Sequence, residues 1–225
     1  MKNITIKIFV FFCLLSFGFQ ESVAQVAPGM VGVMTPSVTP LVTYATYNST
    51  YKGATVTLSG VTVMTVSPTN GVACATIGAS TTGKSSGKWY WEITNTIRGG
   101  NSSIGVTNSV TAMNLNTFMG ADSHGWAYYS NGGGTGGTWS AGAITIPNWT
   151  DYVQGDVIGV NLDADANTVT FYKYHLGVTT TQGTLSISGG NYFPANSANV
   201  GEFSANYGQS PFVMPVPSGC NPGYY

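Results

Sequence analysis

The chain has 225 residues, a formal net charge of −1 at pH 7 and only 7% charged residues, against roughly 25% in an average soluble domain. Nucleic-acid binding needs clustered lysine and arginine, and the few basic residues beyond residue 25 are scattered, so the composition argues against that function. Hydrophobic residues make up 43%, which is ample for a core, and the length fits one large β domain or two small ones.

The N-terminus has the layout of a secretory signal peptide. Two lysines are followed by the apolar run Ile8–Phe19, and small residues then occupy positions −3 (Ser22) and −1 (Ala24) of a cleavage site. A transmembrane anchor is the alternative, but the run is shorter than the ~20 residues that cross a bilayer. We therefore predict that residues 1–24 are removed and that the protein works in the periplasm, at the cell surface or outside the cell.

The next segment, residues 25–40, carries three prolines and no helical period, which indicates an extended linker. Strand signals begin near Leu41 and continue to about residue 213, so residues 41–213 are the predicted domain. Residues 214–225 contain further prolines and end in SGCNPGYY, which favours a loosely attached C-terminal tail.

The strongest strand signal is Lys88–Ile97, in which Trp89, Trp91 and Ile93 share one face. No window of ten or more residues carries a helical apolar stripe. Many short strands joined by turns predict an all-β sandwich or barrel. Further strands are expected at Ala54–Leu58, Val61–Val66, Val72–Ile77, Ser102–Thr107, Gly125–Tyr129, Val157–Leu162, Thr168–Lys173, Tyr192–Ser197 and Glu202–Tyr207.

The segment Asp163–Asn167 reads as a tight hairpin loop, because aspartate and asparagine favour turns. It also begins like a calcium-binding loop. A complete calcium loop needs glycine at position six and glutamate at position twelve, where this chain has Thr168 and Tyr174. We expect a turn, and no metal site is predicted in the chain.

Several blocks occur in an order that resembles one known family. They are GKWYWEIT, SIGVTN, GWAYYSNG, GDVIGVNLDADANTVTFYK, YFPANS and ANYGQSPF. This series resembles the SPRY domain, in the form frequent in bacterial and phage proteins, over about residues 41–213. The resemblance implies a curved two-sheet antiparallel β-sandwich of the concanavalin-like type. It also implies a non-catalytic module that binds a protein or peptide with loops at one end.

The resemblance also implies which residues form the binding rim. RGGNSSIGVT matches the family segment in which a loop precedes the IGV strand, and YYSNG matches an aromatic-to-glycine turn beside it. The loop before the NYG strand carries valine where some peptide-binding members carry an aromatic residue. The predicted rim consists of Arg98, Gly100, Asn101, Tyr129, Asn131 and Val200.

The glycine-rich insert Asn131–Gly137 is expected to be a flexible loop that reshapes this rim. Trp139 and Trp149 follow it in a Gly/Pro-rich stretch. They are either packed loop anchors or an exposed surface on which sugars or peptides could stack. Together with the predicted export, the second reading supports an alternative function, a carbohydrate-binding or surface-attachment domain.

Two cysteines, Cys74 and Cys220, remain after removal of the signal peptide. An oxidising compartment would allow them to pair. The alternative is that Cys74 is a small core residue and Cys220 a free thiol near the C-terminus.

No catalytic constellation is evident. Ser123 and His124 are adjacent, but no G-x-S-x-G motif and no positioned aspartate accompany them. Glycoside hydrolysis needs two acids facing one cleft, for which Glu92 and Glu202 are the candidates of a third hypothesis. The glycines of NGGGTGG lack the helix and lysine of a phosphate loop. We expect no enzyme, no cofactor, and no membrane insertion after signal cleavage.

Overall fold

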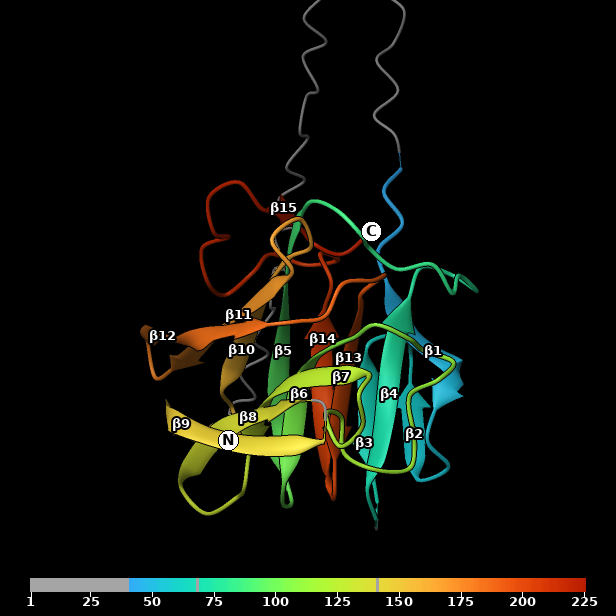
Figure 1. Cartoon of the computed structure of the whole chain (residues 1–225). Helices are drawn as coiled ribbons and strands as arrows, with labels where there is room; N and C mark the ends of the chain where they lie inside the picture. Colours follow the sequence, from blue (N-terminus) through green and yellow to red (C-terminus); the bar gives the residue numbers. More distant parts are fainter. Residues whose placement is uncertain (1–40, 68, 141) are drawn as a thin grey trace, which may run out of the picture. The chain divides into compact units, whose positions relative to one another are not determined.

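The computed structural model describes residues 41–67, 69–140 and 142–225. The predicted signal peptide (1–24) and linker (25–40) lie outside the described residues. The described chain belongs to one compact unit, Leu41–Tyr225 (Figure 1). Within it, no helix has the length and apolar character needed to cross a membrane.

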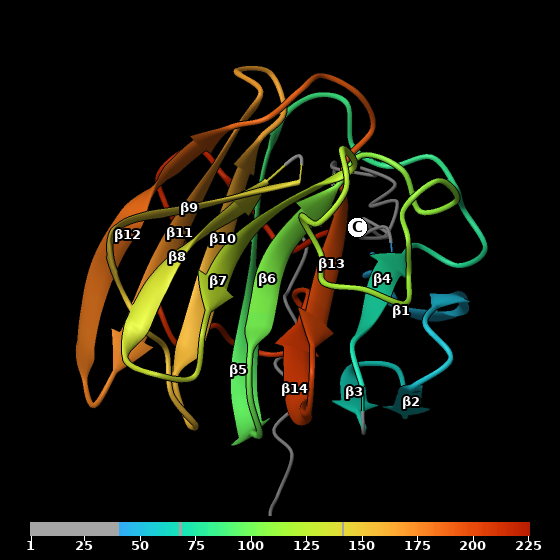
Figure 2. The same cartoon turned by 60° about the horizontal axis from the view of Figure 1, so that its bottom comes forward.

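The fold is a sandwich of two sheets (Figures 1 and 2), as expected from the sequence. The first sheet has seven strands in the order β1 (Thr46–Lys52), β4 (Gly71–Thr76), β13 (Phe193–Ala198), β6 (Ser102–Thr107), β7 (Gly125–Ser130), β8 (Thr135–Ser140) and β9 (Ala143–Thr150). The second runs β12 (Val178–Ser186), β11 (Thr168–His175), β10 (Val157–Asp163), β5 (Lys88–Arg98), β14 (Gly201–Asn206), β3 (Val63–Val66) and β2 (Val56–Ser59), with β15 (Asn221–Pro222) pairing β5. All the named strand pairs are antiparallel except β15–β5.

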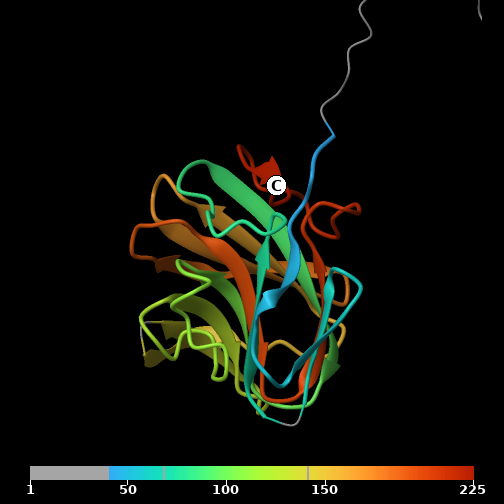
Figure 3. The same cartoon turned by 90° about the vertical axis from the view of Figure 1, so that its right-hand side faces the viewer.

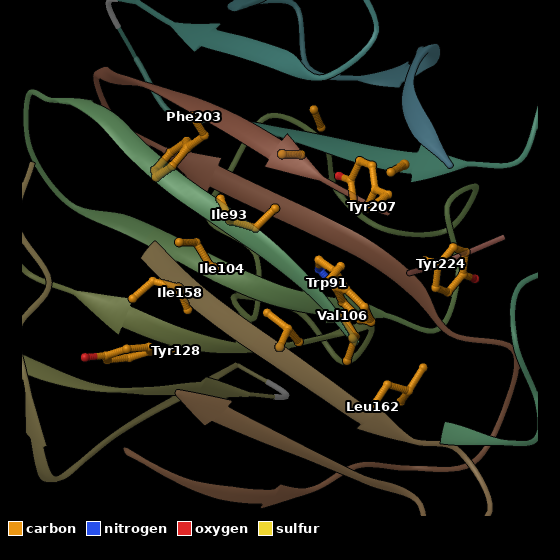
Figure 4. Close-up of a cluster of buried hydrophobic side chains, with 14 of the residues drawn as sticks. Trp91, Ile93, Ile104, Val106, Tyr128, Ile158, Leu162, Phe203, Tyr207 and Tyr224 are labelled. Carbon is orange, nitrogen blue, oxygen red and sulfur yellow. The ribbon is translucent and has the colours of Figure 1, made fainter. Parts of the chain in front are cut away.

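The core lies between the sheets, because alternate side chains of each strand point to the same face. From β5, Trp91 and Ile93 are fully buried there, and β6 contributes Ile104 and Val106. Figure 4 shows these side chains meeting residues of neighbouring strands, among them Phe203. Burying each such side chain contributes about 1.5–3 kcal/mol, so this layer is the main source of stability.

The central strands of the first sheet are buried on their outer face as well. A second cluster there includes Val110 and Met119 from the long β6–β7 connection. Close approach of strands requires glycine at Gly105, where an added Cβ would lie 2.1 Å from the Trp126 carbonyl oxygen. Because the core covers one face of these strands and the second cluster covers the other, β6 and β7 contain no exposed residue.

The C-terminal segment is an integral part of the fold, so the expectation of a loosely attached tail is wrong. Tyr224 is 1% exposed and lies in the core cluster, and its backbone N–H donates to the Tyr207 carbonyl at 2.8 Å. The N–H groups of Val213 and Met214 both donate to the Glu92 carboxylate at 2.8 Å. In Figure 3 this segment (red) lies at the upper end of the sandwich.

Five strands were not predicted from the sequence: β1, β8, β9, β12 and β15. β8 includes the last glycines of the Asn131–Gly137 insert, which is therefore only partly a loop. β9 contains a proline, which a sheet tolerates at an edge strand, and β9 is the edge of the first sheet. β12 is mostly exposed and lacks the apolar alternation that marks a strand.

The hairpin predicted at Asp163–Asn167 is confirmed. β10 and β11 pair in register from Val157↔Tyr174 to Asp163↔Thr168. The Asp163 carboxylate accepts the Ala166 N–H at 2.9 Å inside the turn. Asp163 therefore serves the turn, whereas Asp165 accepts the Gly87 N–H at 2.9 Å from outside it.

The disulfide considered between Cys74 and Cys220 is not formed, and both thiols are free. Cys74 is buried in β4, in the cluster on the outer face of the first sheet. Cys220 packs with the C-terminal segment on the outer face of the second sheet. The core separates the two residues, and burial raises the pKa of the Cys74 thiol to about 12.

Candidate functional site

One end of the sandwich collects the predicted rim. The register places Arg98 opposite Gly201, and Ser102 opposite both Ser130 and Ala198, so the loops that follow β5, β7 and β13 are neighbours. We call this the loop end, formed by residues 99–101, 131–134, 151–156, 176–177 and 199–200. It occupies the lower part of Figure 2.

A buried carboxylate, Asp151, joins several parts of the loop end. Its Oδ2 accepts from Arg98 Nη2 at 2.6 Å and from the Gly134 N–H at 2.9 Å. Its Oδ1 accepts from the Ser130 hydroxyl, and its backbone carbonyl accepts from Lys173 Nζ at 2.8 Å. The Asp151 side chain is 6% exposed, and the buried charge is matched by a charged and hydrogen-bonded environment.

The glycine-rich loop has a defined shape. Gly132 and Gly134 adopt φ values of 75° and 95°, a region that glycine enters without the steric cost of a side chain. The Asn131 side-chain oxygen accepts from the N–H of Gly133 at 2.8 Å and of Thr135 at 3.3 Å. These bonds and the contact with Asp151 hold the loop next to the end of β5.

The two remaining rim loops are bonded to each other. The Gly99 N–H donates to the Val200 carbonyl at 3.2 Å, and the Asn199 N–H donates to the Asn101 carbonyl at 2.9 Å. Gly99 must be a small residue, since an added Cβ would lie 2.6 Å from the Val200 side chain. The side chain of Val200 therefore packs against the backbone of Gly99.

The structure brings together all the predicted rim residues except Tyr129. Tyr129 is only 7% exposed and faces the outer side of the first sheet, where its ring meets Phe118 and Trp139 edge-on at 6.5 and 5.3 Å. Burial raises the pKa of its phenol. A binding role for the rim, Arg98, Gly100, Asn101, Asn131 and Val200, stays a prediction.

The two loop tryptophans pack against other rings. Trp149 meets Tyr128 at 5.2 Å and Phe171 at 5.8 Å, and Trp139 meets Phe118 at 5.2 Å. Both are half-buried members of strands β9 and β8. Their contacts favour the packing role of the two roles considered from the sequence.

Sequence reasoning missed Asp151 and an adjacent hollow. The hollow measures about 420 Å³ and is lined by Thr150, Lys173, His175, Leu176, Val178, Thr180, Thr181 and Gln182. Leu176 and Val178, at the β11–β12 turn, are 88% and 61% exposed. The sequence signal that could have indicated the hollow was the pair of apolar residues, Leu176 and Val178, at a Leu-Gly turn. Nothing near Asp151 in the sequence indicates that its charge is buried.

The candidate acids do not form a hydrolytic pair. Glu92 is 2% exposed and accepts bonds from Tyr90 and from the C-terminal segment. Glu202 accepts from the hydroxyls of Thr96 and Thr65. Among the described residues, no group of three or more His, Cys, Asp or Glu could hold a metal ion. At the loop end, the loops are held in place around a polar hub, the Asp151 carboxylate.

Solved structures share this fold at low sequence identity. The SPRY domain of human HERC1 aligns with a TM-score of 0.56 and 17% identity, over 71% of this chain and 96% of that one. The TRIM65 PSpry domain aligns with a TM-score of 0.57 and 13% identity, over 72% and 92%. Stonustoxin gives 0.54 and 14%, over 72% of this chain and 28% of that one.

The comparison with curated proteins gave no significant match. The family model of the SPRY domain matches residues 88–210, which is more than half of the chain. This range runs from the first residue of β5 to just beyond β14 and contains the whole rim. The chain therefore belongs to the SPRY domain family.

Proposed function

We propose that this protein is an exported, non-catalytic module that recognises a protein or peptide through its loop end. SPRY domains are typically protein-interaction modules, and the chain is one of them. The observation that carries the proposal is the gathering of the rim loops around Asp151 at one end of the sandwich. Loops already fixed in one conformation lose less entropy on binding than flexible ones.

The rim leaves groups available to a partner. Ile97, at the end of β5, is 50% exposed, and the side chain of Asn101 makes no hydrogen bond within the described part of the chain. With a formal net charge of −1, long-range electrostatic steering contributes little. Recognition therefore rests on hydrogen bonds and apolar contacts made at short range.

The test is a pull-down with the chain as bait in an extract of the source cell's envelope and surroundings. The rim variant Asn101→Arg adds bulk at the loop end. A matched control, Thr81→Arg, adds the same side chain at an exposed position of the opposite end. We expect a protein that is retained by the unaltered chain and the control but lost by the rim variant. Equal retention by both variants would contradict a binding site at the loop end.

The export part of the proposal rests on the N-terminal sequence alone and has its own test. The chain is expressed in the source cell and its N-terminus is determined. Gln25 as the first residue, in protein recovered outside the cytoplasm, is the expected result. An intact N-terminus in the cytoplasm would contradict export and leave the binding proposal standing.

A further inference from the structure

β12 is an edge strand whose first part, Val178–Thr181, lacks the usual protection, since the only irregularity in its pairing with β11 lies beyond Thr181. It is the last strand of the second sheet, and it lies at the margin of the fold in Figure 2. Its nine residues, VTTTQGTLS, include no charge and no proline. Edge strands are commonly guarded by charged residues, prolines or a covering segment, because their free backbone groups can pair with another chain.

The β11–β12 turn shows which backbone groups of β12 are free. Leu176 and Gly177 have φ values of 46° and 89° and join His175 to its partner Val178, which is a two-residue hairpin of type I′. The pair that closes such a turn is hydrogen-bonded, and bonded pairs alternate along the ladder. The N–H and C=O groups of Thr179 and Thr181 therefore point away from β11, to the open side.

Hollows lie on both faces of this free segment. The hollow of about 420 Å³ described above lies on its inner face, where Lys173, Thr180 and Gln182 contribute. A second hollow, of about 430 Å³, lies on the outer face and is mostly apolar. It is lined by Tyr90, Tyr172, Thr179, Thr181, Met214, Pro215, Val216 and Pro217.

The inner hollow holds a lysine that has no ion-pair partner among the described residues. Lys173 Nζ donates to the Asp151 carbonyl, and no carboxylate of the described residues lies within ion-pair distance of it. The nearby carboxylates have other partners: Asp151 pairs with Arg98 at 2.6 Å, and Asp156 is hydrogen-bonded to His175 Nδ1 and to the Val153 N–H. An acidic side chain in this hollow would match Lys173.

We propose that β12 binds an extended peptide segment of a partner protein, which adds to the second sheet as a further strand along Val178–Thr181. In such strand addition, backbone bonds give affinity and alternate side chains enter pockets on the two faces. Acidic side chains of the segment enter the inner hollow beside Lys173, and apolar ones enter the outer hollow beside Tyr172. The site contains none of the rim residues, although its inner hollow adjoins the loop end at Leu176. The Asn101→Arg and Thr179→Pro variants therefore test the two proposals separately.

A second copy of this chain fits the edge less well. Pairing of β12 with β12 would bring Val178, Gln182 and threonines to the hollows. It would supply no carboxylate for Lys173, and Val178 lines the inner hollow and not the outer one. The chemistry of the two hollows therefore selects a partner with alternating acidic and apolar residues.

The test uses a fluorescent peptide in which glutamate and valine alternate, and a control peptide of the same composition in which the glutamates form one block.

Two variants of the chain test the backbone contact. Thr179→Pro removes an N–H group on the open side of β12, a change that an edge strand tolerates. Thr179→Ala keeps that N–H and loses only the side chain. We expect the alternating peptide to bind the full chain at least about tenfold more tightly than the block peptide. Thr179→Pro should remove this binding, and Thr179→Ala should retain it.

Hydrogen exchange provides a second readout that does not depend on a variant's folding. The amides of Thr179 and Thr181 should exchange more slowly with the alternating peptide than with the block peptide. Equal binding of both peptides, or unchanged binding by folded Thr179→Pro, would overturn the proposal. It would also be overturned by self-association in sedimentation that Thr179→Pro abolishes, because the occupant would then be a second copy.

Discussion

The two ends of the sandwich are closed by different physical means. At the tail end, where the C-terminal segment packs, Tyr224 lies edge-on to Trp91 at 5.7 Å and tilted against Trp89 at 6.2 Å. Lys84 Nζ lies 4.0 Å from the centre of a Trp89 ring. At the loop end the corresponding place is taken by Asp151, held by charged and backbone donors. The tail end is closed by the packing of aromatic rings, and the loop end by a buried carboxylate, which we call the Asp151 hub.

This difference assigns distinct tasks to the two ends. Apolar burial is non-directional and contributes stability in proportion to area, so the tail end stabilises the fold. A buried charge with directional bonds adds little net stability but is costly to leave unpaired. The hub therefore serves mainly to fix the positions of the loops around it, which is what the proposed recognition surface needs.

The largest expected effect is at the tail end. Tyr224→Ala should lower the free energy of unfolding by about 3–5 kcal/mol, because truncation of a buried aromatic side chain leaves a cavity. The change also removes the bond that the Tyr224 hydroxyl donates to the Tyr192 carbonyl at 2.5 Å. Urea unfolding followed by tryptophan fluorescence measures the loss. The matched control is Tyr225→Ala, whose ring is less buried and whose loss should be clearly smaller. Equal losses of stability would mean that burial of the Tyr224 ring is not what closes the tail end.

At the loop end, Arg98→Ala should cost about 3 kcal/mol, because it leaves the Asp151 carboxylate buried without its charged partner. The Arg98→Ala/Asp151→Ala double variant should be less destabilised than the sum of the single variants, since it leaves no unpaired charge. Denaturant unfolding of the set gives the coupling free energy. Additive losses would show that the pair does not organise the loop end.

Tyr129→Ala should cost about 2–3 kcal/mol, below the usual range for a core aromatic, because the ring cluster with Phe118 and Trp139 lies on an outer face. Partner binding by the variant, measured on folded protein, should stay unchanged. Weakened binding with full stability would show that Tyr129 belongs to the rim after all. The outer face of the first sheet and the loop end would then not be distinct in function.

These expectations indicate what the sequence could and could not predict. Strands with apolar alternation, such as β5, were found, and ordered family blocks placed Arg98 and Val200 in one region. Tyr128 and Tyr129 are adjacent aromatics, and alternation cannot tell which of them faces the core when a distant connection covers the other face. Asp151 and Tyr224 owe their roles to contacts between segments far apart in the chain, for which no local pattern exists.

The smallest expected effect concerns an exposed pair at the tail end. Lys88 Nζ lies 2.8 Å from Asp163 Oδ2, with side chains 47% and 19% exposed. The hydrogen bond from Lys88 lowers the pKa of Asp163, and the bond to Asp163 raises that of Lys88. A carboxylate with a lowered pKa stabilises the fold above its unfolded value of about 3.9 and loses this contribution as the pH falls through its folded pKa.

Asp163→Asn should therefore reduce stability slightly near neutral pH and have a smaller effect at strongly acidic pH, because exposed ion pairs contribute little and are screened by salt. Urea midpoints of the two proteins at both pH values, at low and high salt, measure the difference. The Asp151 hub is shielded from solvent, so its coupling to Arg98 should resist salt, whereas that of Lys88 and Asp163 should not. Equal salt sensitivity of the two pairs would show that burial of Asp151 does not isolate the loop end from solvent, and the contrast between the two ends would then rest on aromatic packing alone.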